Sequence, residues 1–157
     1  MKLGMQLKPE LLFESHLTAE NQLIELVSEI KPHLKNHSLL LLSGDLAAGK
    51  TTFTRYLCGL YNLKSIQSPT YAIHQRYQNE LIVIDHFDLY RMQSEDDLVS
   101  TGFWDLLREE KSLVIVEWFE KIHDNTWLEV ESHKRNIFAV KIEVLDDMRH
   151  FKFFKLI

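Results

Sequence analysis

Cysteine is almost absent from this chain, which has 157 residues and a single cysteine, Cys58. No intrachain disulfide is therefore possible, which suits a reducing compartment. No continuous apolar run approaches the ~20 residues that a membrane helix needs. The segment from Met1 to Glu10 also lacks the apolar core of a signal peptide. We therefore expect a soluble, cytoplasmic protein with no membrane association.

An excess of positive charge is also missing. The chain carries 18 Lys and Arg against 23 Asp and Glu, a formal net charge of -5. Proteins that bind nucleic acid on their own usually present a basic face, so this balance argues against strong independent binding to DNA or RNA. Since 45% of the residues are hydrophobic and no repeat or linker is visible, we predict one domain over residues 1–157.

Glycine is sparse too, yet two of the five glycines stand in one motif. The motif runs Gly44-Asp45-Leu46-Ala47-Ala48-Gly49-Lys50-Thr51, between an apolar strand expected at 38–42 and a helix expected at 51–57. Glycines permit a backbone that turns N–H groups toward phosphates, and the helix adds its positive end. Lys50 would supply charge at the β- and γ-phosphates and Thr51 a hydroxyl ligand for magnesium. The motif predicts a site for a nucleoside triphosphate and magnesium.

Strands alternate with helices through the first two-thirds of the chain, which is typical of a layered α/β fold. Asp146-Asp147 reads as a polar turn between two late strands, which should pair antiparallel at one edge of an otherwise parallel sheet. We therefore predict a P-loop NTPase-like three-layer fold with a mainly parallel sheet and antiparallel C-terminal strands. The expected strands lie at 38–42, 71–77, 81–85, 113–116, 127–131, 137–145 and 150–157.

A phosphate loop of this kind needs an acid at a strand end to hold magnesium through water. One expected strand ends at Asp85, Asp88 lies just beyond it, and another strand runs into Glu117. The pattern alone favours Asp85 and Glu117 equally, and we expect at most two of the three acids to reach the metal.

Three shorter motifs follow the phosphate loop in order. They are Ser68-Pro69-Thr70-Tyr71, His86-Phe87-Asp88-Leu89-Tyr90-Arg91 and Glu117-Trp118. The ordered set, over roughly residues 18 to 118, resembles the TsaE (YjeE) family, the small bacterial ATPase subunit of the tRNA threonylcarbamoyladenosine machinery. The chain departs from the family at Ala47, where glycine is usual, and we expect the methyl group to fit if the local φ is negative.

The resemblance implies roles for individual residues. Thr70 would be the switch threonine near the γ-phosphate, Asp88 the essential acid of its motif, and Glu117 an acid linked to metal or nucleotide. This moves the expected metal ligands to Thr51, Asp88 and Glu117, and makes Lys50, Thr70, Asp88 and Glu117 the expected catalytic set. The expected nucleotide-binding set is Gly44, Asp45, Leu46, Ala47, Ala48, Gly49, Lys50, Thr51, Thr52 and Trp118.

The resemblance also implies an ATP hydrolase that works with Mg²⁺ inside a protein complex. Its partners would be the other two proteins of the threonylcarbamoyl-transfer complex, with tRNA contacted only indirectly. Arg55, Arg76 and Arg91 are candidate cationic helpers, but none reads as an arginine finger, so we predict slow turnover alone and stimulation by partners. Two alternatives stay open: a small-molecule kinase, and a nucleotide-gated interaction module without turnover.

Overall fold

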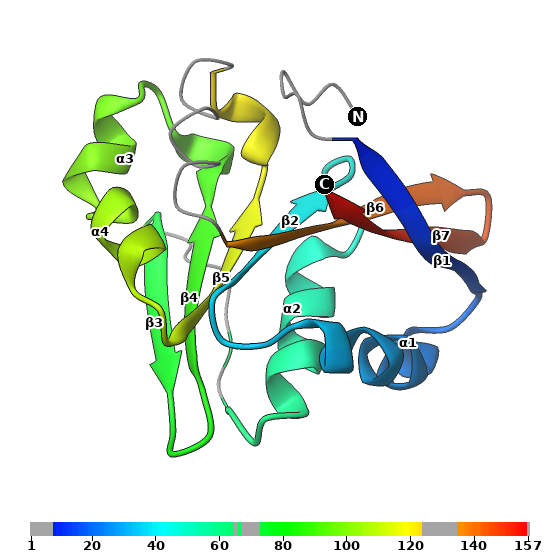
Figure 1. Ribbon diagram of the computed structural model, residues 1–157. Coiled ribbons are helices and arrows are strands. Elements are labelled where there is room, and N and C mark those ends of the chain that lie inside the picture. The colour runs from blue at the N-terminus through cyan, green and yellow to red at the C-terminus, as the bar shows by residue number, and fades with distance from the viewer. Residues whose placement is uncertain (1–7, 65, 67–72, 124–134, 157) are drawn as a thin grey trace.

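The computed structural model describes residues 8–64, 66, 73–123 and 135–156. Seven strands form one sheet in the order β1-β7-β6-β2-β5-β4-β3 (Figure 1). The strands are β1 Pro9–Leu17, β2 Ser38–Ser43, β3 His74–Gln78, β4 Val83–Asp88, β5 Ser112–Glu117, β6 Asn136–Leu145 and β7 Met148–Leu156. The helices are α1 Leu23–Ile30, α2 Lys50–Gly59, α3 Asp96–Ser100 and α4 Phe103–Arg108, with 3-10 turns η1 Glu20–Gln22, η2 Lys31–His33, η3 Leu89–Arg91 and η4 Phe119–Lys121. None of the helices in this part of the chain is long and apolar enough to cross a membrane.

The centre of the sheet is parallel and both of its edges are antiparallel. Strands β6, β2, β5 and β4 run parallel to one another, and β2 and β5 are buried along their whole length. Such burial is typical of strands covered on both faces. The predicted fold class is confirmed, as is the antiparallel pairing of β6 with β7. The expectation of a single antiparallel edge is wrong, because β3 also pairs antiparallel with β4. The connection at 79–82 is too short for the crossover that parallel strands need.

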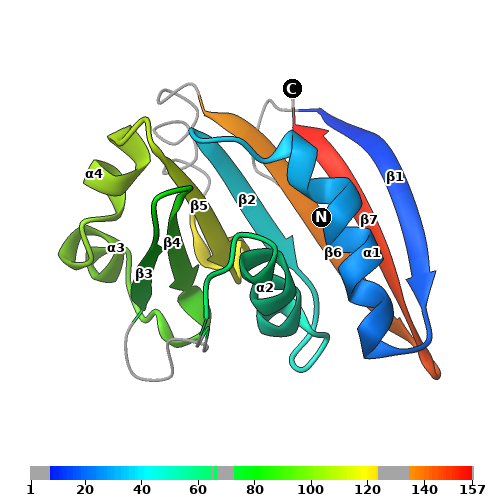
Figure 2. The same cartoon turned by 90° about the horizontal axis from the view of Figure 1, so that it is seen from below.

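Helices cover the two faces of the sheet and make the fold three-layered. Helices α1 and α2 lie over one face, and α3 and α4 lie on the other side of the central strands (Figures 1 and 2). Alternate residues of one strand point to opposite faces. In β2, Leu40 and Leu42 belong to the core under α1 and α2, whereas Leu39 and Leu41 belong to the core under α3 and α4. The position of a residue along its strand therefore decides which face it can serve.

The carboxyl ends of β2, β5 and β4 meet at one edge of the sheet. Glu117 pairs in register with Leu42 of β2 on one side and with Asp88 of β4 on the other. The loop that follows β2 and the turns that follow β4 and β5 therefore start side by side. In open α/β sheets this edge is where ligands bind.

Candidate functional site

The loop from Gly44 to Gly49 joins β2 to α2 and depends on both of its glycines. Gly49 caps α2 in the left-handed conformation, with φ 110° and ψ 18°. Gly44 has φ 153°, and a Cβ there would stand 2.6 Å from the Ile142 carbonyl oxygen of β6. The first turn of α2 leaves N–H groups without helical partners and adds the positive end of the helix dipole. The loop is therefore built to receive an anion.

Ala47 also adopts a left-handed conformation, with φ 62°. The expectation of a negative φ at this position is wrong. The loop has positive φ at Ala47 as well as at its two glycines. For alanine, this left-handed conformation costs about 1–2 kcal/mol. Leu46, beside it, is 67% exposed at the tip of the loop.

Lys50 lies at the first position of α2 and folds back over its own loop. Its Nζ donates to the carbonyl oxygens of Gly44, at 2.6 Å, and Asp45, at 2.9 Å. The same Nζ stands 3.9 Å from the centre of the Trp118 ring. Burial lowers the pKa of Lys50, and the nearby carboxylates of Glu117, Glu120, Asp88 and Asp45 act in the opposite direction. The negative charge of a bound phosphate would raise the pKa of Lys50 in the same way as these carboxylates do.

Glu117 lies at the end of β5 and is almost completely buried. Its Oε2 accepts a hydrogen bond of 3.1 Å from the Thr51 hydroxyl, and its Oε1 lies 2.9 Å from His86 Nε2. Hydrogen bonds to a charged group each stabilise by roughly 1.5–3 kcal/mol, which helps to offset the cost of burying a carboxylate. The contact with Thr51 joins the acid to the phosphate loop across the sheet edge.

Asp88 stands next to Glu117 at the end of β4, at the start of η3. Its side chain accepts a hydrogen bond of 3.0 Å from the Tyr90 backbone N–H, and its own N–H donates to the Ile73 carbonyl. Residues 84, 86 and 88 alternate onto one face of β4, and Ile84 packs in the core under α1 and α2. Asp88 is therefore on the side of the sheet that carries the phosphate loop.

Asp85 points to the opposite face of β4. It is fully buried and accepts hydrogen bonds of 2.8 Å from both His74 and Arg76 Nε, while Arg76 also contacts Glu109 at 2.9 Å. Burial acts to raise the pKa of Asp85, but the bonds from His74 and Arg76 outweigh it and hold the pKa below its ordinary value. Asp85 is therefore bound within the β3–β4 hairpin on the side of the sheet away from the loop. This leaves Glu117 as the better of the two acids that the pattern alone favoured equally.

Trp118 follows Glu117 with φ 58°, an uncommon conformation for a bulky residue. That conformation carries its ring over Lys50 and against Tyr90, whose ring centre lies 5.1 Å away. Thr52 accepts a hydrogen bond of 3.1 Å from Arg55. Thr70 is the one expected site residue that lies outside the described residues. The strand expected at 127–131 also lies outside them.

Sequence reasoning missed two side chains that reach this edge. Glu120 of η4 accepts a hydrogen bond from Ser43 at the end of β2 and adds negative charge near Lys50. Arg149 of β7 donates from Nε to the Ala48 carbonyl at 3.0 Å. His86 was expected to pack or hydrogen-bond beside Asp88, and its hydrogen-bond contact is with Glu117. Arg149 is about 100 residues along the chain from the loop it touches, so no local pattern could have indicated it.

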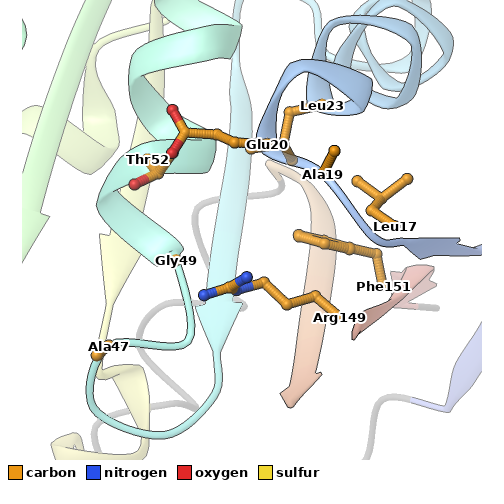
Figure 3. Close-up of a pocket in the computed structure, with 9 residues that line it drawn as sticks. All are labelled: Leu17, Ala19, Glu20, Leu23, Ala47, Gly49, Thr52, Arg149 and Phe151. Atoms are coloured by element: carbon orange, nitrogen blue, oxygen red, sulfur yellow. The ribbon is translucent and has the colours of Figure 1, made fainter. Parts of the chain in front are cut away.

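A pocket opens beside the phosphate loop, between the start of α1 and β7 (Figure 3). Arg149 reaches across from β7 toward Gly49, and Leu17, Leu23 and Phe151 supply apolar surface on the other side (Figure 3). Such a combination of apolar walls with a few polar groups is common in small-molecule sites. The remaining lining residues are Ala19, Glu20, Ala47 and Thr52.

The side chains at Thr51, Asp88 and Glu117 fit a magnesium ion in chemistry. All three offer hard oxygen donors, the ligands that Mg²⁺ prefers. Thr51 Oγ1 and Glu117 Oε2 lie 3.1 Å apart. Neighbouring ligands of an octahedral ion with metal–oxygen distances of about 2.1 Å stand about 3 Å apart, so this separation suits one cation.

The fold and the loop define the class of the protein as a phosphate-loop α/β protein. The solved structure of YdiB from Bacillus subtilis has the same fold, with a TM-score of 0.65 and 21% identity over 96% of this chain and 88% of that one. The family model described as threonylcarbamoyl adenosine biosynthesis protein TsaE matches residues 17–149. The chain belongs to the TsaE family, and the resemblance seen in its motifs is confirmed.

Curated relatives in several bacteria are named tRNA threonylcarbamoyladenosine biosynthesis protein TsaE. The relative from Rickettsia conorii is 37% identical over 110 residues, 68% of this chain and 61% of that protein. The one from Haemophilus influenzae is 38% identical over 59% of this chain and 58% of its own length. The one from Aquifex aeolicus is 32% identical over 71% and 80%. The matched part of the chain thus spans about three fifths of the length of the first two relatives.

Proposed function

We propose that the chain binds ATP with Mg²⁺ at the carboxyl edge of its sheet and hydrolyses it slowly. It would do so as the ATPase of a protein complex that makes threonylcarbamoyladenosine in tRNA. The contact that best supports this is the hydrogen bond between Thr51 of the loop and Glu117 of β5, at 3.1 Å. It joins the hydroxyl and the acid that a phosphate-loop hydrolase needs for its metal.

The position of each residue supports the role that we propose for it. Lys50, released from the carbonyls of its own loop, would bind the β- and γ-phosphate oxygens. Thr51 and Glu117 would hold the ion, which when bound supplies a charge that stabilises the transferring phosphoryl group. Asp88, held by the Tyr90 N–H, would orient a water near the γ-phosphate. Thr70 would complete the set from the segment before β3, and Trp118 would cover Lys50 at the γ-phosphate end.

The Lys50→Ala variant tests nucleotide binding. Removing the ammonium leaves phosphate charge uncompensated in a partly buried site, at a cost of about 2–5 kcal/mol, so ATP binding should fall by at least ~30-fold. Titration calorimetry with Mg²⁺ measures this. Lys111→Ala, an exposed lysine before β5, is the matched control and should bind as the unaltered chain does. Equal affinity in the Lys50 variant would contradict the proposal.

We propose further that the nucleoside lies in the pocket of Figure 3. The Lys50 ammonium lies beside Gly44 at the start of the loop and against Trp118, while Gly49 and Thr52 border the pocket at the end of the loop. A triphosphate whose γ-end meets Lys50 would therefore carry its base toward the pocket. Ala19 lines it in an extended conformation that accepts a large side chain.

Ala19→Phe, which partly fills the pocket, tests the position of the nucleoside. The variant should weaken ATP binding about tenfold or more and leave inorganic tripolyphosphate unaffected, because tripolyphosphate has no base. Asn21→Phe, on an exposed position of η1 outside the pocket, is the control. If the Ala19 variant binds ATP normally, the base lies elsewhere.

The names of the relatives support a proposal for the process in which this activity is used. The curated relatives are named for tRNA threonylcarbamoyladenosine biosynthesis. We propose that this chain acts in the same modification in the cytoplasm, through the proteins that transfer the threonylcarbamoyl group. A net charge of -5 suits an indirect role toward tRNA. Phosphate release measured with and without candidate acceptors separates this activity from that of a small-molecule kinase, since a phosphorylated acceptor would favour the kinase.

A further inference from the structure

His86 is a fully buried polar residue on the strand next to the edge strand β3, with no role in the function proposed above. It lies on β4, paired in register with Ile115 of β5, and its side chain faces α2 between Ile84 and Asp88. Its Nε2 stands 2.9 Å from Glu117 Oε1. The other oxygen of that carboxylate receives the Thr51 hydroxyl at 3.1 Å. One carboxylate is thus held from both sides, by the sheet through His86 and by the phosphate loop through Thr51.

The chemistry of the contact assigns the hydrogen atom. A carboxylate that binds a cation is ionised and only accepts hydrogen bonds, so the proposed metal site assigns the proton to His86 Nε2 and leaves Nδ1 as the other ring nitrogen. Nδ1 is buried and has no hydrogen-bond partner in the part of the chain that the structure describes. An apolar side chain would fill this space without burying an unpaired nitrogen, as Ile84 and Phe87 do beside it. The bond to Glu117 is therefore the feature that requires a histidine.

We propose that His86 is a positioning residue for Glu117: it holds Oε1 so that Oε2 stays directed at Thr51 and the cation site. This inference rests on the proposed binding of Mg²⁺ and ATP. Without the donor, the carboxylate is free to rotate within its pocket and loses its alignment with Thr51. Hydrogen-bond partners of metal-binding carboxylates typically change metal affinity or activity by about 10–100-fold when they are removed.

Two substitutions separate positioning from simple packing. His86→Leu removes the donor but keeps an apolar filler, whereas His86→Gln offers an amide N–H in place of Nε2. Ile84→Val is the control, since it trims a buried neighbour on the same face that is paired with Leu113, four residues before Glu117. Calorimetry would measure ATP affinity for each variant with Mg²⁺ and with EDTA, and steady-state assays would give kcat and KM.

The expected result is a loss of Mg²⁺-dependent affinity and of kcat, with metal-free ATP binding unchanged. His86→Leu should bind ATP in EDTA like the unaltered chain, but lose about tenfold or more of the affinity gained from Mg²⁺ and a similar factor in kcat. His86→Gln should recover most of both, and Ile84→Val should change neither. If His86→Leu keeps the full gain from Mg²⁺, or if Gln restores nothing while binding in EDTA stays normal, the positioning role is wrong. If the unaltered chain gains no affinity from Mg²⁺, the proposed metal site fails and this inference fails with it.

A measurement on the unaltered chain without nucleotide remains decisive even if both substitutions prevent folding. Long-range proton–nitrogen spectra distinguish the two ring tautomers of His86. A proton on Nε2 is expected, and a proton on Nδ1 alone would overturn the inference.

Discussion

At the scale of single residues, Ala47 shows how a departure from a family pattern is absorbed. Its φ of 62° is a conformation that glycine adopts freely and alanine adopts at a cost. The sequence showed that alanine stands in the loop but not the sign of its φ, because that sign depends on how the loop packs against β6 and β7. The chain thus keeps a small strain beside the residues that would bind phosphate.

Ala47→Gly should make the protein slightly more stable. Relief of the left-handed strain is worth about 1–2 kcal/mol, and the extra freedom of glycine in the unfolded chain takes back about 0.4–1 kcal/mol. The expected net gain is about 0.5–1 kcal/mol, measured by urea unfolding without nucleotide.

The control for Ala47 is the same substitution one residue later. Ala48 is buried and is not among the residues with positive φ. Ala48→Gly should therefore lower stability by about 1–2 kcal/mol, through lost methyl burial and added freedom in the unfolded chain. Destabilisation of similar size in both variants would show that Ala47 is not strained.

At the scale of elements, the β3–β4 hairpin places two of the three candidate acids on opposite faces of the sheet. Asp85 faces α3 and α4 and is bound by Arg76 and His74, whereas Asp88 faces the phosphate loop. Residues 81–84 are all apolar, so the sequence does not reveal which face each residue of the strand serves. The cross-strand pairing of Arg76 with Asp85 settles it.

Asp85→Asn should destabilise the fold and leave nucleotide binding intact. Removing one partner of a buried ion pair costs about 3–5 kcal/mol, and because Arg76 is about one third exposed we expect about 2–4 kcal/mol. Urea unfolding measures the loss, and ATP titration should show unchanged affinity. The comparison variant is Glu117→Gln, which should show the converse result, with Mg²⁺-dependent ATP binding impaired. Weakened ATP binding in a folded Asp85 variant would restore Asp85 as a metal ligand.

The same pair predicts how stability depends on pH. The pKa of Asp85 is lower in the folded protein than in the unfolded chain, where it is near 4. Its contribution is therefore complete above about pH 4 and is lost as the pH falls through the lower folded value. The difference in unfolding free energy between the unaltered chain and Asp85→Asn should be constant near neutral pH and shrink in acid. A difference that grows in acid would contradict the assigned direction.

The sequence predicted most of the parallel core and missed one outer strand. Strands β2 and β5 were predictable because each is a pure apolar run. Strand β1 was not predicted, because a register shift between Leu11 and Phe13 breaks the alternation that marks a strand. In the site, the loop and the acids Asp88 and Glu117 came from local motifs. The contacts of Glu120 and Arg149 with this edge arise only when distant segments pack together.

At the scale of the whole molecule, the candidate site combines residues from β2, α2, β4 and β5, and three arginines of the described chain form contacts away from its γ-phosphate end. Arg76 is bound to Asp85 and Glu109 across the sheet, and Arg55 contacts Thr52. Arg135 is buried among backbone carbonyls that include those of Leu107 and Ser112. None of these contacts directs a guanidinium at the γ-phosphate end of the loop.

A partner should therefore raise the rate of hydrolysis. An arginine supplied from outside can raise phosphoryl transfer by about 10³–10⁵-fold, and we expect the transfer proteins to increase phosphate release at least about tenfold. The measurement is phosphate release at saturating ATP for the chain alone and with its partners, with Lys50→Ala as the inactive control. Rapid hydrolysis by the isolated chain would contradict this prediction. Glu117→Gln, at ATP and Mg²⁺ concentrations that saturate its weakened site, decides whether hydrolysis is needed at all. If that variant assembles with ATP but the complex stalls after one round of tRNA modification, turnover resets the complex. If modification continues at the normal rate, nucleotide binding alone gates the complex.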